Sequence, residues 1–330
     1  MVEIAGGRFL IVGGASYSGS HITDQLLAAG AAHVVLFDNN SLNSSYAIEH
    51  LVGNPAVSVF KGDMLRLESL MEAADGVDGI FAVAAYLAGP MAADMRQGLD
   101  VNIHGIRNVL ETCRLRKIPR LVYSSSVGVY GNATQLDRIE ENTPLITDGM
   151  GSVMTIYSAT KVIGENLCRF YGDTYGIEWA ALRYSSIYGP RQHGHSINAL
   201  PVVTSYEALS QGQRPVIYGD GDDVHDYIYV GDLAAANLKA MAASGAGAAT
   251  VVSGRARSVN DIVRIMSARL GVPFDPEYRD PEGRLAFTKS THLQYVRDRA
   301  RDMWGWEPLV ELEEGIDRYV EWREGKRLHA

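Results

Sequence analysis

The feature that most constrains the fold is an apolar run that passes directly into a glycine-rich turn and then into a helical pattern. Phe9-Leu10-Ile11-Val12 is followed without a spacer by Gly13-Gly14-Ala15-Ser16-Tyr17-Ser18-Gly19, and helical periodicity continues over Ser18–Ala29. Glycine is needed where a strand turns sharply into a helix and the two backbones pass closely. The segment therefore predicts the first strand–turn–helix unit of an α/β protein.

The remainder of the first half repeats this alternation of short apolar runs and longer helical patterns. Continuous apolar runs are typical of parallel strands, which are covered on both faces. We expect strands and helices in the following segments: Arg8–Gly13, Ser18–Ala29, His33–Asp38, Val57–Lys61, Gly79–Ala84, Met95–Arg116, Arg120–Ser125, Thr155–Tyr175 and Trp179–Arg183. The pattern predicts an α/β fold with a Rossmann-type, doubly wound parallel sheet.

The second half has weaker alternation and more Gly, Pro and Tyr. We expect residues 1–184 to form the Rossmann domain, including a catalytic helix. Residues 185–330 should form mainly a smaller mixed C-terminal lobe that binds substrate, with elements returning to the Rossmann sheet near 216–253. Within this lobe, Ser185–Tyr218 and Leu270–Ser290 carry the turn residues of loops that shape a pocket.

Composition and net charge limit the classes of binding partner that the chain can have. The formal net charge of −9 provides no basic surface for a phosphate backbone, so nucleic acid is not expected as a partner. The chain has no run of 18 apolar residues and no leader-like start, which predicts a cytoplasmic protein without a membrane partner. Cys113 and Cys168 fall in helical patterns, and their spacing indicates neither a metal site nor a disulfide.

The glycine-rich turn has the context of a dinucleotide-binding loop. A helix that begins near Ser18 offers free N–H groups and partial positive charge to a pyrophosphate. Asp38 ends the second strand 19 residues after Gly19, where a carboxylate meets ribose hydroxyls and repels a 2′-phosphate, so NAD is expected rather than NADP. Asp63 could contact adenine or only form a turn. A tight structural turn without ligand is the alternative for the whole loop.

Two side chains of the long helix could carry acid–base chemistry. Tyr157 and Lys161 are four residues apart and so project from one helical face. A tyrosine with its ordinary pKa near 10 is a poor base at neutral pH, and a nearby ammonium together with the positive charge of a nicotinamide can lower that pKa. Upstream, the strand ends in three hydroxyls, Ser124-Ser125-Ser126, at the edge of the sheet where ligands bind.

These motifs resemble the extended short-chain dehydrogenases/reductases, the NAD-dependent epimerase/dehydratase family. The resemblance covers nearly the whole chain and rests on motifs in the family's order: the glycine loop, Val101-Asn102-Ile103-His104-Gly105, Ser124 to Gly131, the Tyr157/Lys161 pair, Leu182-Arg183-Tyr184 with Tyr188-Gly189-Pro190-Arg191, and Tyr218-Gly219-Asp220-Gly221 with Asp226-Tyr227-Ile228-Tyr229-Val230.

The resemblance implies a role for each matching residue. Tyr157 would be the acid/base, Lys161 would bind the nicotinamide ribose and lower the pKa of that tyrosine, and Ser126 would orient the substrate hydroxyl. Cofactor contacts are expected from Gly13, Ser16, Tyr17, Ser18, Gly19, Asp38, Asp63, Met64, Ala84, Asn102, Ser124 and Lys161. Substrate contacts are expected from Ser126, Val127, Tyr157, Ser186, Arg191 and His225. Asn102 could instead be a helix-interior residue satisfied by backbone, and Arg183 could be structural. Family members also dimerise through two long helices, here 95–116 and 155–175.

Departures from the family pattern bear on the reaction. Val127 and Gly128 replace the Asp-Glu pair of the dehydratases, so dehydration is not expected. Ser186 and His225 replace an asparagine and an arginine that hold the diphosphate of nucleotide sugars, which favours a smaller substrate. We therefore expect an NAD-dependent oxidoreductase acting at a hydroxyl or keto carbon of a sugar-like or small hydroxylated substrate. A nucleotide-sugar (UDP-sugar) 4-epimerase with tightly bound NAD is the alternative, and a non-catalytic NAD-sensing module is a remote one.

Overall fold

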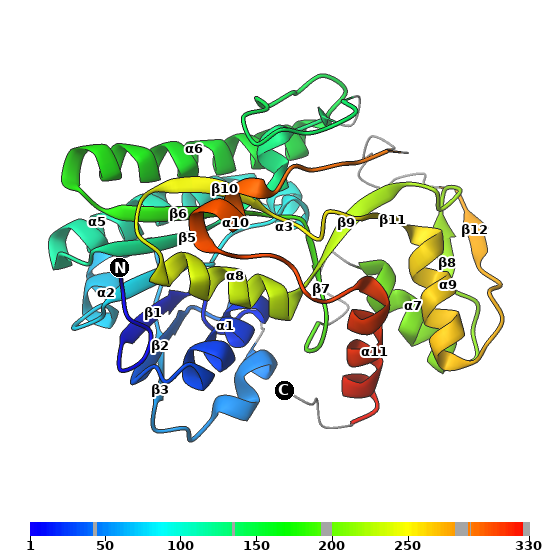
Figure 1. The fold of residues 1–330 in the computed structure, drawn as a ribbon, viewed down its shortest axis with the longest axis horizontal. Helices are drawn as coiled ribbons and strands as arrows, with labels where there is room; N and C mark the ends of the chain where they lie inside the picture. Colours follow the sequence, from blue (N-terminus) through cyan, green and yellow to red (C-terminus); the bar gives the residue numbers. More distant parts are fainter. Residues whose placement is uncertain (42–44, 134–135, 193–199, 281–289, 291, 326–330) are drawn as a thin grey trace.

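The large sheet contains seven parallel strands and organises the molecule (Figure 1). The computed structural model describes residues 1–41, 45–133, 136–192, 200–280, 290 and 292–325. The strand order is β10-β6-β5-β4-β1-β2-β3. The bounds are β1 Arg8–Val12, β2 His33–Asp38, β3 Val57–Lys61, β4 Gly79–Ala82, β5 Arg120–Ser126, β6 Glu178–Tyr184 and β10 Gly247–Val251. The predicted doubly wound parallel sheet is confirmed.

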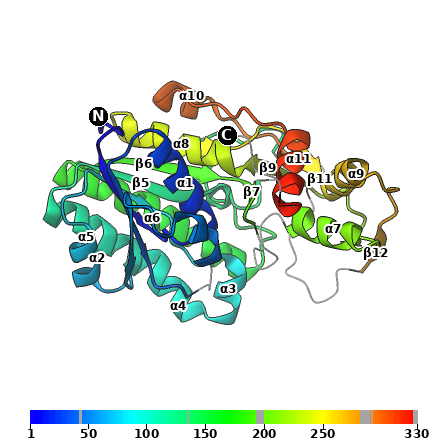
Figure 2. The ribbon, with the colours of Figure 1, turned by 90° about the horizontal axis from the view of Figure 1, so that it is seen from below.

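Successive residues of each central strand enter opposite hydrophobic cores. On β1, Phe9 and Ile11 face one core and Leu10 and Val12 face the other, as the period of two in a strand requires. The first core is closed by α1 (Tyr17–Ala28), α8 (Val230–Ala242) and α10 (Asp298–Trp304). The second core is closed by α2 (Leu67–Ala73), α5 (Ile106–Arg116) and α6 (Ser152–Tyr175). Figures 1 and 2 show these two layers on either side of the sheet.

The predicted helix over Met95–Arg116 is interrupted. It consists of α4 (Met95–Leu99), a π-helical turn over Asp100–Gly105, and α5. A short helix, α3 (Ala88–Ala93), precedes it. The π turn places Asn102 against the backbone of Tyr86, where its amide makes two hydrogen bonds. The helical periodicity of the sequence does not distinguish this π turn from a continuous α-helix.

The smaller lobe is built from regular elements. The three-stranded sheet has the order β11-β9-β7 and the two-stranded sheet pairs β12 with β8, with bounds β7 Ser186–Tyr188, β8 Val216–Tyr218, β9 Val224–Tyr229, β11 Ala256–Ser258 and β12 Glu277–Arg279. Helices α7 (Leu200–Ser210), α9 (Val259–Leu270) and α11 (Leu312–Arg323) surround these strands at one end of the molecule (Figure 1).

The loops predicted for Ser185–Tyr218 are therefore wrong, because that segment contains β7, α7 and β8. The apolar side chains of Val202, Val203 and Tyr206 pack into a third core, so tertiary burial stabilises a helix where turn residues nearby indicated a loop. In the second predicted loop, Leu270–Ser290, the described part contains β12, and residues 281–289 lie outside the described residues.

The chain returns to the large sheet late in the sequence. Of the span 216–253, α8 and β10 belong to the large sheet and its cover, whereas β8 and β9 belong to the smaller sheets. The strands β4 and β1 are neighbours in the sheet, and from this point the chain proceeds outward in opposite directions, through β2 and β3 on one side and through β5 and β6 on the other. A reversal of this kind leaves a crevice at the carboxyl ends of the strands, where ligands of such sheets bind. None of the helices in the described ranges is long and apolar enough to cross a membrane.

Candidate active site

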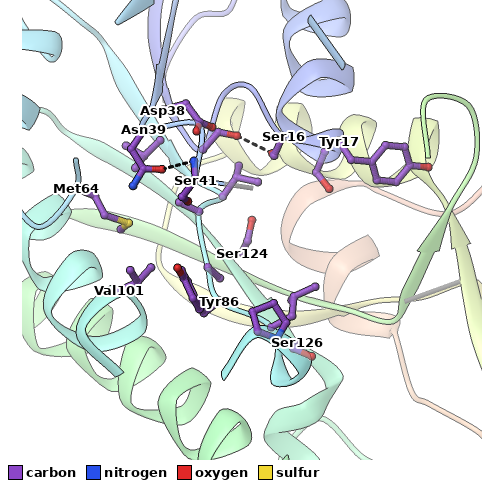
Figure 3. A pocket seen from close by; sticks show the side chains of 18 of the residues that line it. Ser16, Tyr17, Asp38, Asn39, Ser41, Met64, Tyr86, Val101, Ser124 and Ser126 are labelled. Carbon is purple, nitrogen blue, oxygen red and sulfur yellow. Dashed lines mark hydrogen bonds between the residues drawn. The ribbon is translucent and has the colours of Figure 1, made fainter. Parts of the chain in front are cut away.

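A cavity of about 340 Å³ lies at this crevice. Its walls come from the carboxyl ends of β1, β2, β4 and β5, the start of α1, the face of α6 that carries Tyr157 and Lys161, and the segment after β6. The predicted site residues that line it are Gly13, Ser16, Tyr17, Ser18, Asp38, Asp63, Met64, Ala84, Ser124, Ser126, Tyr157 and Lys161. In Figure 3, Asp38, Asn39 and Ser16 lie toward one end, Ser126 lies at the other, and Ser124 lies between them.

The glycine loop is shaped by close backbone contacts. Gly13 has φ +86°, and a Cβ there would stand 2.6 Å from the backbone nitrogen of Ala84. A Cβ on Gly19 would stand 2.6 Å from the carbonyl oxygen of Gly13. Gly19 therefore permits the contact between helix and turn and does not itself line the cavity. The loop tolerates no side chain at either position.

Ser16 caps the helix that follows the loop. Its hydroxyl accepts a hydrogen bond from the Gly19 amide at 3.1 Å and donates one to the Gly13 carbonyl at 2.6 Å. The amides of Tyr17 and Ser18 are at the first positions of α1, where N–H groups have no partner within the helix. The ring of Tyr17 points away from Ser16, Ser124 and Ser126 (Figure 3), so its contribution to the cavity comes from the backbone side.

Two carboxylates, Asp38 and Asp63, line the end of the cavity that lies beside the glycine loop, which we call the nucleotide end. Asp38 accepts hydrogen bonds from the Ala15 amide at 3.1 Å and the Asn40 amide at 2.7 Å, which fix its orientation beside the loop. Burial raises the pKa of Asp38, against the opposing effect of these amides. Asp63 accepts from the Leu65 amide at 2.9 Å, the turn-forming role that was the alternative, and it borders the cavity as well. Each carboxylate keeps lone pairs for a ligand.

The acid–base candidates Ser126, Tyr157 and Lys161 line the other end of the cavity, which we call the catalytic end. The Lys161 ammonium donates to the Ser124 carbonyl oxygen at 2.8 Å and stands 5.8 Å from the centre of the Tyr157 ring. Ser126 is placed to hydrogen-bond with the phenol of Tyr157, and its hydroxyl also accepts from the Gly128 amide at 3.0 Å. The helix and the adjoining strand thus bring all three side chains into one cavity.

The expected lowering of the Tyr157 pKa by Lys161 is not found in the chain alone. Burial raises the pKa of Tyr157 to about 12, and the hydrogen bond with Ser126 opposes this rise. Burial lowers the pKa of Lys161 to about 8, while the Glu165 carboxylate works in the opposite direction. Both shifts disfavour the charged form, as expected for groups removed from water. Burial therefore outweighs the neighbouring ammonium in setting the pKa of Tyr157 in the chain alone.

Asn102 supports the site without lining the cavity. Its carbonyl oxygen accepts from the Tyr86 amide at 2.8 Å, and its amide nitrogen donates to the Tyr86 carbonyl at 2.9 Å and to the Thr160 hydroxyl at 3.2 Å. These hydrogen bonds fit the alternative of a helix-interior residue satisfied by protein groups, and the cofactor contact by Asn102 stays a prediction. It connects the segment after β4 with the helix that carries Tyr157.

The expected substrate contacts of the second lobe do not reach the cavity. Arg191 forms an ion pair with Asp24 on α1 at 2.6 Å and contacts His50 at 2.7 Å. The Nε2 atom of His225 lies 2.8 Å from a carboxylate oxygen of Asp223. Ser186 and Val127 are likewise absent from the lining of this cavity. Nearby carboxylates contact both Arg191 and His225 in the described structure, and a substrate role for either residue stays a prediction.

Several cavity residues were missed by sequence reasoning: Asn39, Ser41, Tyr46, Tyr86, Leu87, Tyr184, Ser185 and Ile187. Ser185 and Ile187 flank Ser186, which stands on the other side of the chain. The period of two in an extended segment would have placed Ser185 and Ile187 together once β7 was recognised. Tyr86 follows β4 at the edge where strand ends meet, which was the available signal for that residue.

The residues present fit a dinucleotide. The side-chain-free turn at Gly13, the helix that starts at Tyr17 and the fixed carboxylate of Asp38 are all in one cavity. Residues 9–253 match the model of the NAD dependent epimerase/dehydratase family. The chain belongs to this family, whose cofactor is NAD, and it is an enzyme of the extended short-chain dehydrogenase/reductase type.

Individual relatives are similar over almost their whole length. The chain is 31% identical over 319 residues to a putative UDP-glucose 4-epimerase of Methanocaldococcus jannaschii, covering 95% of this chain and 97% of the relative. It is 29% identical over 323 residues to the UDP-glucose 4-epimerase of Mycolicibacterium smegmatis, covering 97% and 99%. The structure of Thermus thermophilus UDP-glucose 4-epimerase in complex with NAD matches with a TM-score of 0.82 and 29% identity, covering 96% of this chain and 99% of that one.

Proposed function

We propose that this enzyme oxidises a hydroxyl-bearing sugar carbon of a nucleotide sugar with bound NAD and reduces it again, as a 4-epimerase. The observation that carries the proposal is that Ser126, Tyr157 and Lys161 line the same cavity as the capped loop at Ser16 and the carboxylate of Asp38. The similarity to UDP-glucose 4-epimerases over nearly the whole chain supports the nucleotide sugar as the substrate class.

Each residue then has a chemical role. The amides at the start of α1 bind the pyrophosphate, and Asp38 accepts from ribose hydroxyls. NAD supplies a hydride acceptor and a positive charge when bound. Tyr157 takes the proton of the substrate hydroxyl, Ser126 orients that hydroxyl, and the Lys161 ammonium stabilises the phenolate. Tyr157 returns the proton when the carbon is reduced again.

Dehydration is not part of the proposal. The carboxylates that line the cavity within the described chain are Asp38 and Asp63, and both lie at the nucleotide end. At the catalytic end, Val127 and Gly128 follow Ser126 and provide no acid or base for removing water.

A single assay tests the epimerase. Purified protein is supplied with NAD and UDP-glucose or UDP-galactose, the products are separated by chromatography, and absorbance at 340 nm is followed. We expect interconversion of the two sugars without net NADH. Net NADH with an oxidised sugar would contradict epimerisation and identify a dehydrogenase. The absence of any product from either sugar nucleotide would contradict the substrate class.

A second candidate is oxidation of a smaller hydroxylated or keto compound. It is favoured by the observation that Arg191 and His225 are held by carboxylates and do not offer charge to a diphosphate linker. The same assay with free sugars and small secondary alcohols separates the candidates. Turnover of these compounds, with none for the sugar nucleotides, would favour the smaller substrate.

We also propose a homodimer through α5 and α6. Both helices form the outer layer on one side of the sheet (Figure 1), and they expose Leu115, Ile163, Phe170 and Tyr175 with 39–54% of each residue accessible. Exposed apolar residues that gather on adjacent helices indicate an interface. Light scattering should give twice the mass of the 35.9 kDa chain, and the variant I163E/F170E should give the monomer. A monomeric parent protein would contradict the dimer.

A further inference from the structure

A buried carboxylate stands one helical turn beyond the catalytic lysine. Glu165 follows Lys161 by four residues on α6, so the two side chains project from the same face. The side chain of Glu165 is only 10% exposed. It accepts a hydrogen bond from the Ser125 hydroxyl at 2.6 Å and two from Arg183, at 2.9 and 2.7 Å. This is a bidentate, charge-assisted arrangement, which holds position as well as charge.

The partners of Glu165 belong to the strands that form the catalytic wall. Ser125 stands between Ser124, which accepts from Lys161, and Ser126. Arg183 on β6 is the direct register partner of Ser125 on β5. Arg183 also donates to the Tyr130 hydroxyl at 3.0 Å, just after the strand. The carboxylate therefore ties the helix that carries the lysine to both neighbouring strands.

Because Lys161 is buried among neutral groups, a nearby negative charge has a large effect on whether its side chain stays protonated. From β5, the Tyr123 ring centre lies 5.3 Å from the ammonium, and from α6 the Tyr157 ring centre lies 5.8 Å away. Both phenols are held neutral by burial, which raises their pKa values. Arg183 on β6 is paired with Glu165 at 2.7 Å and adds a positive charge beside this carboxylate. Glu165 thus provides the carboxylate that favours the ammonium form.

We propose that Glu165 is a positioning residue for Lys161: it keeps the ammonium charged beside Tyr157, and with Ser125 and Arg183 it holds the end of β5 in place. The assignment of Lys161 to the reaction rests on the proposed function. The effect of Glu165 on the charge of Lys161 is a property of the protein alone and is measured without substrate.

The direct test is a titration of Lys161 by NMR. The chain has six lysines, so the 13Cε signals can be resolved, and the variant K161M identifies the signal of interest. In E165Q we expect the midpoint of Lys161 to fall by about one pH unit, because a neighbouring carboxylate has been removed. In E165D, which keeps the charge, the midpoint should stay close to that of the parent. If E165Q does not fold, E165A in place of it removes the same charge, and S125A tests the positioning role separately.

Two further variants separate charge from packing. S125A removes a hydrogen bond and leaves the carboxylate, so the Lys161 midpoint should be unchanged while kcat falls several-fold. E178Q is the matched control, because Glu178 pairs with Arg120 at 3.8 Å at the opposite ends of the same two strands. It should alter neither the midpoint nor kcat.

The pH profile of turnover provides a second readout. In E165Q the alkaline limb should move to lower pH by the same amount as the Lys161 midpoint. An unchanged midpoint in E165Q, or a midpoint displaced equally in E165D, would overturn the charge role of Glu165. Unchanged kcat in S125A would overturn its positioning role. A displaced midpoint in an enzyme that turns over no tested substrate would instead count against the proposed function and leave the effect on Lys161 standing.

Discussion

The two ends of the cavity are built in different ways. At the nucleotide end, Gly13, Ser16 and Asp38 are held by contacts with the backbone of one strand–turn–helix unit and the strand that follows it. At the catalytic end, Ser126 and Tyr157 come from elements separated in sequence and meet only through packing. The comparison teaches that a local unit can be recognised from its own residues. Which side chains line a wall built from distant segments is decided by how those segments pack, and this cannot be recognised from any one of them.

The largest effect should come from the catalytic end. Tyr157→Phe removes the phenol oxygen but keeps the ring in its buried position, so the fold should persist. Turnover should fall about 10²- to 10⁴-fold, the usual contribution of a general acid–base group. Steady-state kinetics measure the loss, and circular dichroism checks the fold. Activity within a few-fold of the parent would assign the proton transfer to another group.

The nucleotide end should be broken by a single methyl group. In Gly13→Ala the new Cβ meets the Ala84 backbone, and φ is already +86°. We expect a loss of about 2–3 kcal/mol in the free energy of unfolding, together with loss of NAD binding. Urea unfolding and calorimetry with NAD measure the two effects.

A matched control separates strain from contact. Gly76 has φ +66° and nothing within 4 Å of the position that a methyl group would take, so Gly76→Ala should cost only about 1 kcal/mol and leave NAD binding intact. Equal losses in the two variants would mean that conformational strain alone, and not the approach to Ala84, explains the requirement for glycine at position 13.

A third prediction concerns the cost of burying Lys161. Its pKa is lowered from 10.5 in the unfolded chain to about 8 in the folded one. Between these values the unfolded chain binds more protons, so folding stability rises with pH in this window. The unfolding free energy of the parent should therefore rise relative to that of K161M by about 2–3 kcal/mol between pH 8 and pH 10.5. Denaturant titrations at several pH values measure this difference, and a constant difference would refute the shift.

The smallest effect should come from the arginine of the second lobe. Arg191→Ala removes the ion pair with Asp24 on α1, which is partly exposed, and should cost about 1 kcal/mol or less. The Michaelis constant should change less than about two-fold, because this side chain does not line the cavity. Arg183→Ala is the contrasting variant, since it leaves the buried Glu165 unpaired and should cost about 3–5 kcal/mol. A large rise in the Michaelis constant for Arg191→Ala would restore a substrate role.

Much of the Rossmann part was predictable from the chain. The strands β2 and β3 begin and end at the residues that the apolar runs indicated, and β1, β4 and β5 differ by at most two residues. The segments that became α7 and β7 were interpreted as loops, because turn residues surround them and their apolar side chains are buried only by distant partners. The π turn at Asn102 was also missed, since the helical periodicity of the sequence runs through it without a break.

The candidate site likewise has a part that the sequence predicted and a part that only the tertiary structure revealed. Residue types and spacing were enough to nominate Gly13, Asp38, Tyr157 and Lys161, because local geometry dictates which side chains such a turn and such a helix present. The tertiary structure alone decided that Arg191 and His225 are occupied by carboxylates and that burial, not the neighbouring ammonium, dominates the pKa of Tyr157. Charge pairing and desolvation depend on neighbours brought together in space, and these cannot be read from positions along the chain.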